Sequence, residues 1–97
     1  VVGVGTCSGR KVDKFAKFAL TPRPAEKVGA PLIDECYASL ECKVVDTRLM
    51  NRYNFFVLEV VKAWVAPKEK EPRTLHHRGG GRFMVAGKTL RTTSRIK

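Results

Sequence analysis

Cysteines are scarce in this sequence, and long apolar runs are absent from it. The three cysteines, Cys7, Cys36 and Cys42, are an odd number and too few for a disulfide scaffold, so we expect a reducing compartment and a cytoplasmic protein. The longest apolar runs extend over only a few residues, so we expect no membrane-spanning helix. No basic segment followed by an apolar stretch opens the chain, so we expect no secretory signal.

Acidic residues are absent from residues 72–97, so the positive charge of the chain is uneven. The chain has 19 Lys and Arg residues and nine Asp and Glu residues, which give a formal net charge of +10. Residues 1–71 hold all nine acids and twelve bases, whereas residues 72–97 hold seven bases. Such a basic segment can face nucleic acid, a phosphate-bearing ligand or only water.

An initiator methionine is also lacking, and the chain begins with the apolar sequence VVGVG at residues 1–5. This segment reads like the end of a strand, so we expect a fragment or a chain trimmed at its N-terminus. The 97 residues fit at most one small domain. Hydrophobic residues make up 43% of the chain, which is enough for a packed core and excludes wholesale disorder.

Residues 8–20 have the pattern of an amphipathic helix. Their apolar side chains recur at the spacing i, i+3, i+4 and i+7, which places them on one helical face. Ser8 is a suitable N-cap, because its hydroxyl can accept a hydrogen bond from an early backbone N–H. Two prolines within residues 21–24 end the predicted helix.

Residues 36–49 and 55–65 read as two long strands. The first alternates apolar and polar side chains, and the second is rich in β-branched and aromatic residues. The turn residues at 51–54 join them into a predicted β-hairpin. Shorter strand candidates lie at residues 73–77, 82–86 and 89–94. A helix followed by antiparallel strands predicts a mainly β, α+β chain rather than a βαβ unit.

The glycine-rich residues 3–9 are similar to a phosphate-binding loop that enters a helix. A helix N-terminus attracts anions, and Arg10, Lys11 and Lys14 add positive charge nearby. The third glycine of a dinucleotide fingerprint falls on Ser8, however, and no βαβ unit follows. The pattern therefore favours an ordinary strand–turn–helix joint over a phosphate site.

The sequence offers no metal site and no catalytic residue that we can assign. His76 and His77 are adjacent, so on a strand their side chains point to opposite faces, and we expect one in the core and one at the surface. Cys36 and Cys42 lack a neighbouring base, so we expect them to serve as small apolar side chains in the core.

Aromatic residues gather in the strand region. Mixed with basic residues, they could stack on nucleic acid bases, stack on a flavin ring or form the core. We expect Phe55, Phe56 and Trp64 in the core. Tyr53 and Phe83 lie at turns, where contact with a ligand is more plausible.

Three segments of the chain resemble the flavin reductase-like family of FMN-binding split-barrel proteins. They are SGRKVDKFAKFALTP (residues 8–22), APLIDECYASLECKVVDTR (residues 30–48) and YNFFVLEVVKAW (residues 53–64). The C-terminal residues 73–97 are similar to one bacterial branch of the same family. Together these segments cover nearly the whole chain, in the family's order.

The resemblance implies that residues 1–97 are the C-terminal part of one FMN-binding split β-barrel domain, with one helix near the N-terminus and the N-terminal half absent. It implies a homodimer that holds FMN, or FAD, near its interface and uses NAD(P)H as substrate. The expected activity is that of an oxidoreductase that passes electrons from NAD(P)H to or through flavin.

The same resemblance assigns cofactor-binding positions. Lys14 matches a lysine that contacts the flavin in relatives, either at the ring edge or at the phosphate. Phe83 matches an aromatic residue that packs on the cofactor. Tyr53 falls where many relatives have a histidine, so the role of that histidine does not transfer directly. Ser8, Gly9 and Arg10 lie close to the cofactor by motif proximity.

Two other functions stay open at this stage. The basic C-terminal residues could make the chain a small nucleic-acid-binding module, although they lack a groove-entering helix and an RNA-binding signature. The chain could also be a truncated, non-catalytic interaction domain. The resemblance favours flavin and nicotinamide as partners over nucleic acid, and we expect no membrane association.

Overall fold

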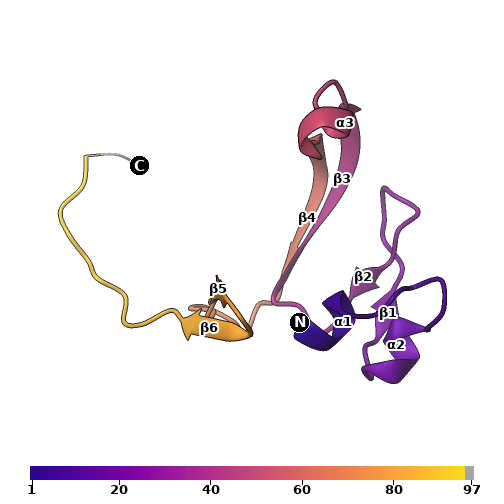
Figure 1. The fold of residues 1–97 in the computed structure, drawn as a ribbon. Coiled ribbons are helices and arrows are strands. Elements are labelled where there is room, and N and C mark those ends of the chain that lie inside the picture. The colour runs from indigo at the N-terminus through magenta and orange to yellow at the C-terminus, as the bar shows by residue number, and fades with distance from the viewer. Residues whose placement is uncertain (96–97) are drawn as a thin grey trace.

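The computed structural model describes residues 1–95, which form six short or medium strands and three one-turn helices. The helices are α1 (Val2–Gly5), α2 (Lys14–Lys17) and α3 (Met50–Tyr53). The strands are β1 (Pro22–Arg23), β2 (Leu32–Ile33), β3 (Ala38–Asp46), β4 (Val57–Val65), β5 (Leu75–Gly79) and β6 (Arg82–Val85). They pair as three two-stranded antiparallel sheets, β1–β2, β3–β4 and β5–β6 (Figure 1). The described chain is therefore mainly β, with open sheets and no closed barrel.

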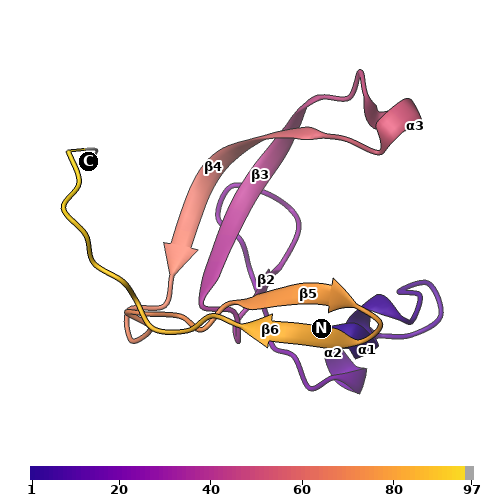
Figure 2. The ribbon, with the colours of Figure 1, turned by 60° about the vertical axis from the view of Figure 1, so that its left-hand side comes forward.

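The longest element is the antiparallel ribbon of β3 and β4, with α3 in the connection at its far end (Figure 2). Its register runs from Ala38 opposite Val65 to Asp46 opposite Val57, with two irregularities between these ends. Asn54 ends α3 in the left-handed conformation, with φ of 51°, and turns the chain toward β4. The predicted hairpin is confirmed, with α3 as part of its turn.

The two faces of this ribbon differ in chemistry. Residues directly opposite each other share a face, and on one face every such pair is apolar. We call this the apolar face; it carries Ala38, Leu40, Cys42, Val44, Leu58, Val60, Ala63 and Val65. All of these side chains are exposed except that of Cys42, which is half-buried. The opposite face carries Glu41, Lys62 and Trp64, and we call it the polar face.

The N-terminal region is less helical than its pattern predicts. The helix expected over residues 8–20 contracts to α2, whose N-cap is Asp13 rather than Ser8: the Asp13 carboxylate accepts from the backbone N–H of Ala16 at 3.2 Å. Ala19 has a positive φ of 52°, which ends the helix one turn after it begins. Residues 2–5, expected as a strand end, form α1 instead.

The sheet of β5 and β6 closes with three consecutive glycines in the left-handed region. Gly79, Gly80 and Gly81 have φ of 85°, 57° and 72°, values that side chains with a Cβ rarely adopt. Both strands were expected, with slightly different limits. The third strand candidate at residues 89–94 is wrong: the ladder stops where the Ala86 N–H donates to the Thr74 carbonyl at 2.9 Å, and residues 87–94 form no strand.

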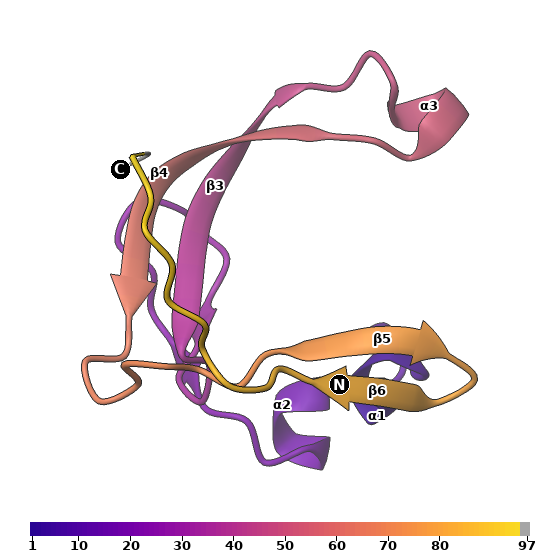
Figure 3. The ribbon, with the colours of Figure 1, turned by 90° about the vertical axis from the view of Figure 1, so that its left-hand side faces the viewer.

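The described residues do not build a core of their own. Leu32 is the one apolar side chain among them that is buried. Phe55 and Phe56, expected in the core, are 55% and 42% exposed, so that expectation is wrong. The radius of gyration is 16.8 Å, against about 12.5 Å for a compact chain of this length. Figure 3 shows the resulting open shape, in which the β3–β4 ribbon and the β5–β6 sheet project in different directions.

Candidate functional site

Four of the expected cofactor-binding residues lie together in the segment that leads into α2. The Ser8 hydroxyl accepts from the backbone N–H of Arg10 at 3.3 Å and so tightens the turn. A Cβ on Gly9 would lie 3.9 Å from Cε of Lys14, so the Lys14 side chain runs past the glycine backbone. Residues 9–15 line an open hollow at this point.

Positive charge dominates this hollow. Arg10, Lys11 and Lys14 line it beside a single acid, Asp13, whose carboxylate caps α2. Within the described residues none of the three cations forms an ion pair. The Lys14 ammonium donates to the carbonyl of Val4 at 2.7 Å, which ties α1 to α2. An open hollow lined by cations that form no ion pair is suited to an anionic group such as a phosphate.

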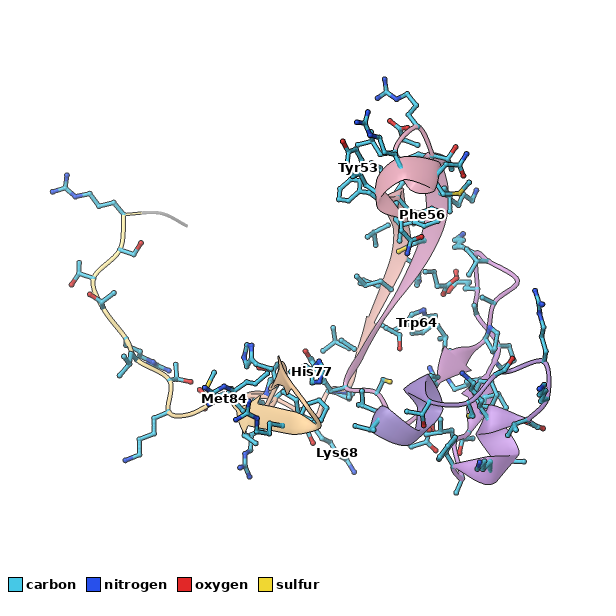
Figure 4. All side chains as sticks on the ribbon, viewed as in Figure 1. Tyr53, Phe56, Trp64, Lys68, His77 and Met84 are labelled. Carbon is cyan, nitrogen blue, oxygen red and sulfur yellow. The ribbon has the colours of Figure 1, made fainter. Side chains whose placement is uncertain are left out.

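Tyr53 lies far from this hollow, in α3 at the tip of the ribbon (Figure 4). Its ring is 62% exposed, and the Arg52 guanidinium lies 5.3 Å from the ring centroid. Nearby, Arg48 and Asp46 form an ion pair at 2.6 Å, and this contact lowers the pKa of Asp46. Its exposed ring is open to a ligand or another chain, and the ligand contact expected for Tyr53 stays a prediction.

Phe83 lies on a third element, the strand β6. Its half-buried ring packs against His77 of β5, with the centroids 5.0 Å apart and the planes tilted by 35°. His76 and His77 are both exposed, so neither occupies the core position expected for one of them. No group of three potential metal ligands occurs among residues 1–95.

Lys14, Tyr53 and Phe83 lie on three different elements, so the described chain alone does not bring them to one place.

The best-ordered polar cluster is one that sequence reasoning missed, on the polar face of the ribbon. Glu41 is only 1% exposed and is the most deeply buried side chain described. Its Oε1 accepts from the backbone N–H groups of Glu26, Lys27 and Val28, at distances of 3.1, 2.5 and 3.2 Å. Its Oε2 accepts from the indole N–H of Trp64 at 2.6 Å. One carboxylate thus fastens the loop to the ribbon and holds the indole of Trp64 in place.

These hydrogen bonds keep Glu41 ionised despite its burial. Burial alone raises the pKa of a carboxyl, but the Trp64 indole and the three loop amides outweigh it and lower the pKa of Glu41 to about 2. Cations flank the same tryptophan: the Arg23 guanidinium lies 5.5 Å and the Lys62 ammonium 5.0 Å from its ring. The one signal in the sequence was that Glu41 and the sole tryptophan fall on strands that pair as a hairpin.

The described chain is thus an open, mainly β structure. It has a cation-lined turn, an apolar sheet face that no described element covers, and aromatic side chains on separate elements. Residues 3–84 match the family described as the flavin reductase-like domain. Because this match covers most of the chain, the chain belongs to the flavin reductase-like domain family. Family membership supports a flavin-related function.

Two similar proteins are described as uncharacterized. The uncharacterized protein YddH of Escherichia coli (strain K12) is 34% identical over 100 residues, covering 90% of this chain and 52% of YddH. An uncharacterized protein of Archaeoglobus fulgidus is 42% identical over 57 residues, covering 59% of this chain and 32% of that protein. The chain therefore spans about half the length of the first relative and about a third of the second.

None of the helices described in residues 1–95 has the length and apolar character needed to cross a bilayer.

Proposed function

We propose that this chain is the C-terminal part of an FMN-binding split β-barrel oxidoreductase that passes electrons from NAD(P)H to or through flavin. The observation that carries the proposal is the match of residues 3–84 to the flavin reductase-like domain family. The three free cysteines are compatible with the reducing cytoplasm that we propose as its location.

The apolar face of the ribbon supports the barrel part of this proposal. Leu40 is 60%, Leu58 52% and Val60 51% exposed, on a face without a single polar side chain. A contiguous apolar surface of this kind marks a site that another segment covers. We propose that strands preceding this chain close over the apolar face and complete one split-barrel domain, which then forms a homodimer.

The cation-lined hollow fits the phosphate end of FMN, and FAD shares that chemistry. Arg10 and Lys11 are free to neutralise the phosphate, and Gly9 lets it approach the backbone. FMN supplies the hydride and electron chemistry of its ring when it is bound. Tyr53 and Phe83 lie on other elements, and we propose that they reach the ring only in the complete dimer.

The direct test of this function is a flavin titration followed by nicotinamide oxidation. The purified protein is expected to bind FMN, seen as quenching of flavin fluorescence, and to oxidise NADH or NADPH in the presence of FMN. Riboflavin and FAD serve as comparison ligands that separate the contributions of phosphate and adenylate. The absence of both flavin binding and nicotinamide oxidation, with every combination of flavin and nicotinamide, contradicts the proposed function.

Replacing Lys14 with glutamine is expected to weaken FMN binding about tenfold, because the hollow that we propose for the phosphate loses one of its three positive charges. Riboflavin, which has no phosphate, should bind nearly as before. Lys17→Gln is the matched control, since Lys17 belongs to the same one-turn helix but does not line the hollow. Equal losses for FMN and riboflavin contradict a role of Lys14 at the phosphate, and Lys14→Arg tests whether charge alone restores binding.

A further inference from the structure

The C-terminal part of the described chain is a cationic projection. Residues 72–95 comprise β5, β6 and the segment that follows, and we call them the arm. In Figure 1 the arm follows the end of β4 and extends away from the β3–β4 ribbon. No acid occurs in the arm. Its described cations are Arg73, Arg78, Arg82, Lys88, Arg91 and Arg95.

The charge of the arm is uncompensated. The four ion pairs of the described chain all join residues within the range 23–62, and none reaches the arm. Every arm cation is exposed. Cations so placed repel one another, and an anionic partner relieves that repulsion.

The arm is not merely charged, because large apolar side chains alternate with its cations. Leu75 is 53%, Met84 52%, Val85 43% and Leu90 92% exposed. A two-stranded sheet is marginally stable alone and gains from a surface against which to pack. Leu75 and Val85 lie directly opposite each other on one face of the β5–β6 sheet, so the arm offers an exposed apolar pair among its cations. Apolar and basic side chains occur together at protein interfaces.

We propose that the arm docks on another protein that presents an acidic surface around an apolar patch. Nucleic acid fits less well, because the arm has no aromatic side chain after Phe83 on which bases could stack, and phosphates leave Leu75 and Leu90 uncovered. A second copy of this chain, which we propose as the dimer partner near Phe83, fits the arm cations less well because these 97 residues have a net charge of +10. The proposal goes beyond flavin binding and does not depend on it.

Fluorescence anisotropy with three labelled probes tests the arm. The probes are a glutamate-rich peptide that carries leucines, the same peptide with serines in place of the leucines, and oligothymidylate of equal charge. At about 50 mM NaCl the purified protein is expected to bind the leucine peptide at least several-fold more tightly than either other probe, and the affinity should fall at about 200 mM NaCl as screening increases.

Two triple variants separate the arm from general positive charge. Replacing Arg78, Lys88 and Arg91 with glutamine is expected to weaken binding of the leucine peptide roughly tenfold. Replacing Lys17, Lys43 and Lys70 with glutamine removes the same charge elsewhere on the surface, and should change the affinity by less than about threefold.

Leu90→Ser tests the apolar part of the arm without a risk to folding, because Leu90 is 92% exposed and lies outside any strand. It should weaken binding of the leucine peptide and leave the serine peptide unchanged. Three outcomes overturn the proposal: oligothymidylate binds most tightly, both triple variants lose affinity equally, or sedimentation shows a dimer that dissociates when the arm cations are replaced.

Discussion

Replacing Glu41 with glutamine is expected to lower the melting temperature by roughly 10 °C. Glutamine has nearly the same shape, but one of its two terminal groups is an NH2 donor. Both carboxylate oxygens of Glu41 accept hydrogen bonds, from the loop amides on one side and from the Trp64 indole on the other. Whichever way the glutamine side chain is oriented, its NH2 group faces either the loop N–H groups or the Trp64 N–H. Two donors then meet, and a buried hydrogen bond is lost.

Two variants separate this effect from the loss of a negative charge alone. Glu59→Gln removes an exposed carboxylate from the paired strand, on the same polar face, and should shift the melting temperature by no more than a few degrees. Trp64→Phe keeps an aromatic side chain, with a smaller ring, but removes the indole donor, so it should reproduce part of the Glu41→Gln effect. Trp64 is the sole tryptophan, so its fluorescence reports directly on this cluster. Equal melting temperatures for Glu41→Gln and Glu59→Gln contradict the assigned role.

The lowered pKa of Glu41 also fixes the direction of a pH effect. The pKa is about 2 in the folded chain, against an ordinary value of 4.5, so the unfolded chain takes up the proton first as pH falls. The stabilisation is complete above about pH 4.5 and is lost progressively between pH 4.5 and pH 2. The difference in melting temperature between the native protein and Glu41→Gln should therefore shrink across this interval. A difference that stays constant or widens on acidification contradicts the lowered pKa.

The sequence predicted the long strands well because their pattern is local. Alternation along residues 36–49 placed apolar and polar side chains on opposite faces, and the structure keeps that division in β3. The helix over residues 8–20 failed for a non-local reason. Asp13 replaces Ser8 as the N-cap, and the apolar stripe is only partly covered, with Ala16 and Ala19 exposed, so only one turn of helix remains.

The candidate site was predictable only in part. Lys14, Arg10 and Gly9 are neighbours in sequence, so their grouping follows from one turn. Tyr53 and Phe83 reside on elements whose relative placement depends on surfaces outside this chain. The Glu41 cluster joins a strand to a loop about 15 residues earlier, and no spacing rule anticipates a carboxylate that collects three consecutive amides.

The Glu41 cluster and the apolar face act together to orient the ribbon. Glu41 fastens the loop and Trp64 to the polar face, which leaves the opposite face as the one open to a partner. A sheet with one covered face and one apolar face is half of a packed layer, and it becomes stable when the second face is covered. The strongest test of the proposed barrel therefore lies on the apolar face.

Leu58→Gln is expected to destabilise the purified protein by about 3 kcal/mol, measured as the free energy of unfolding in urea. Leu58 is 52% exposed in this chain. A glutamine at such an open position changes the free energy of unfolding by no more than about 0.5 kcal/mol. The large loss arises only if the apolar face is covered, because a buried leucine then becomes an unpaired amide.

Glu59→Gln is the matched control, since it places the same residue one position along β4 on the opposite face. A covered apolar face predicts a large loss for Leu58→Gln and almost none for Glu59→Gln, together with weakened FMN binding in the first variant only. Small and equal losses in the two variants mean that the apolar face stays open to solvent. That result removes the physical argument for a barrel closed over the ribbon, whatever the outcome at Lys14.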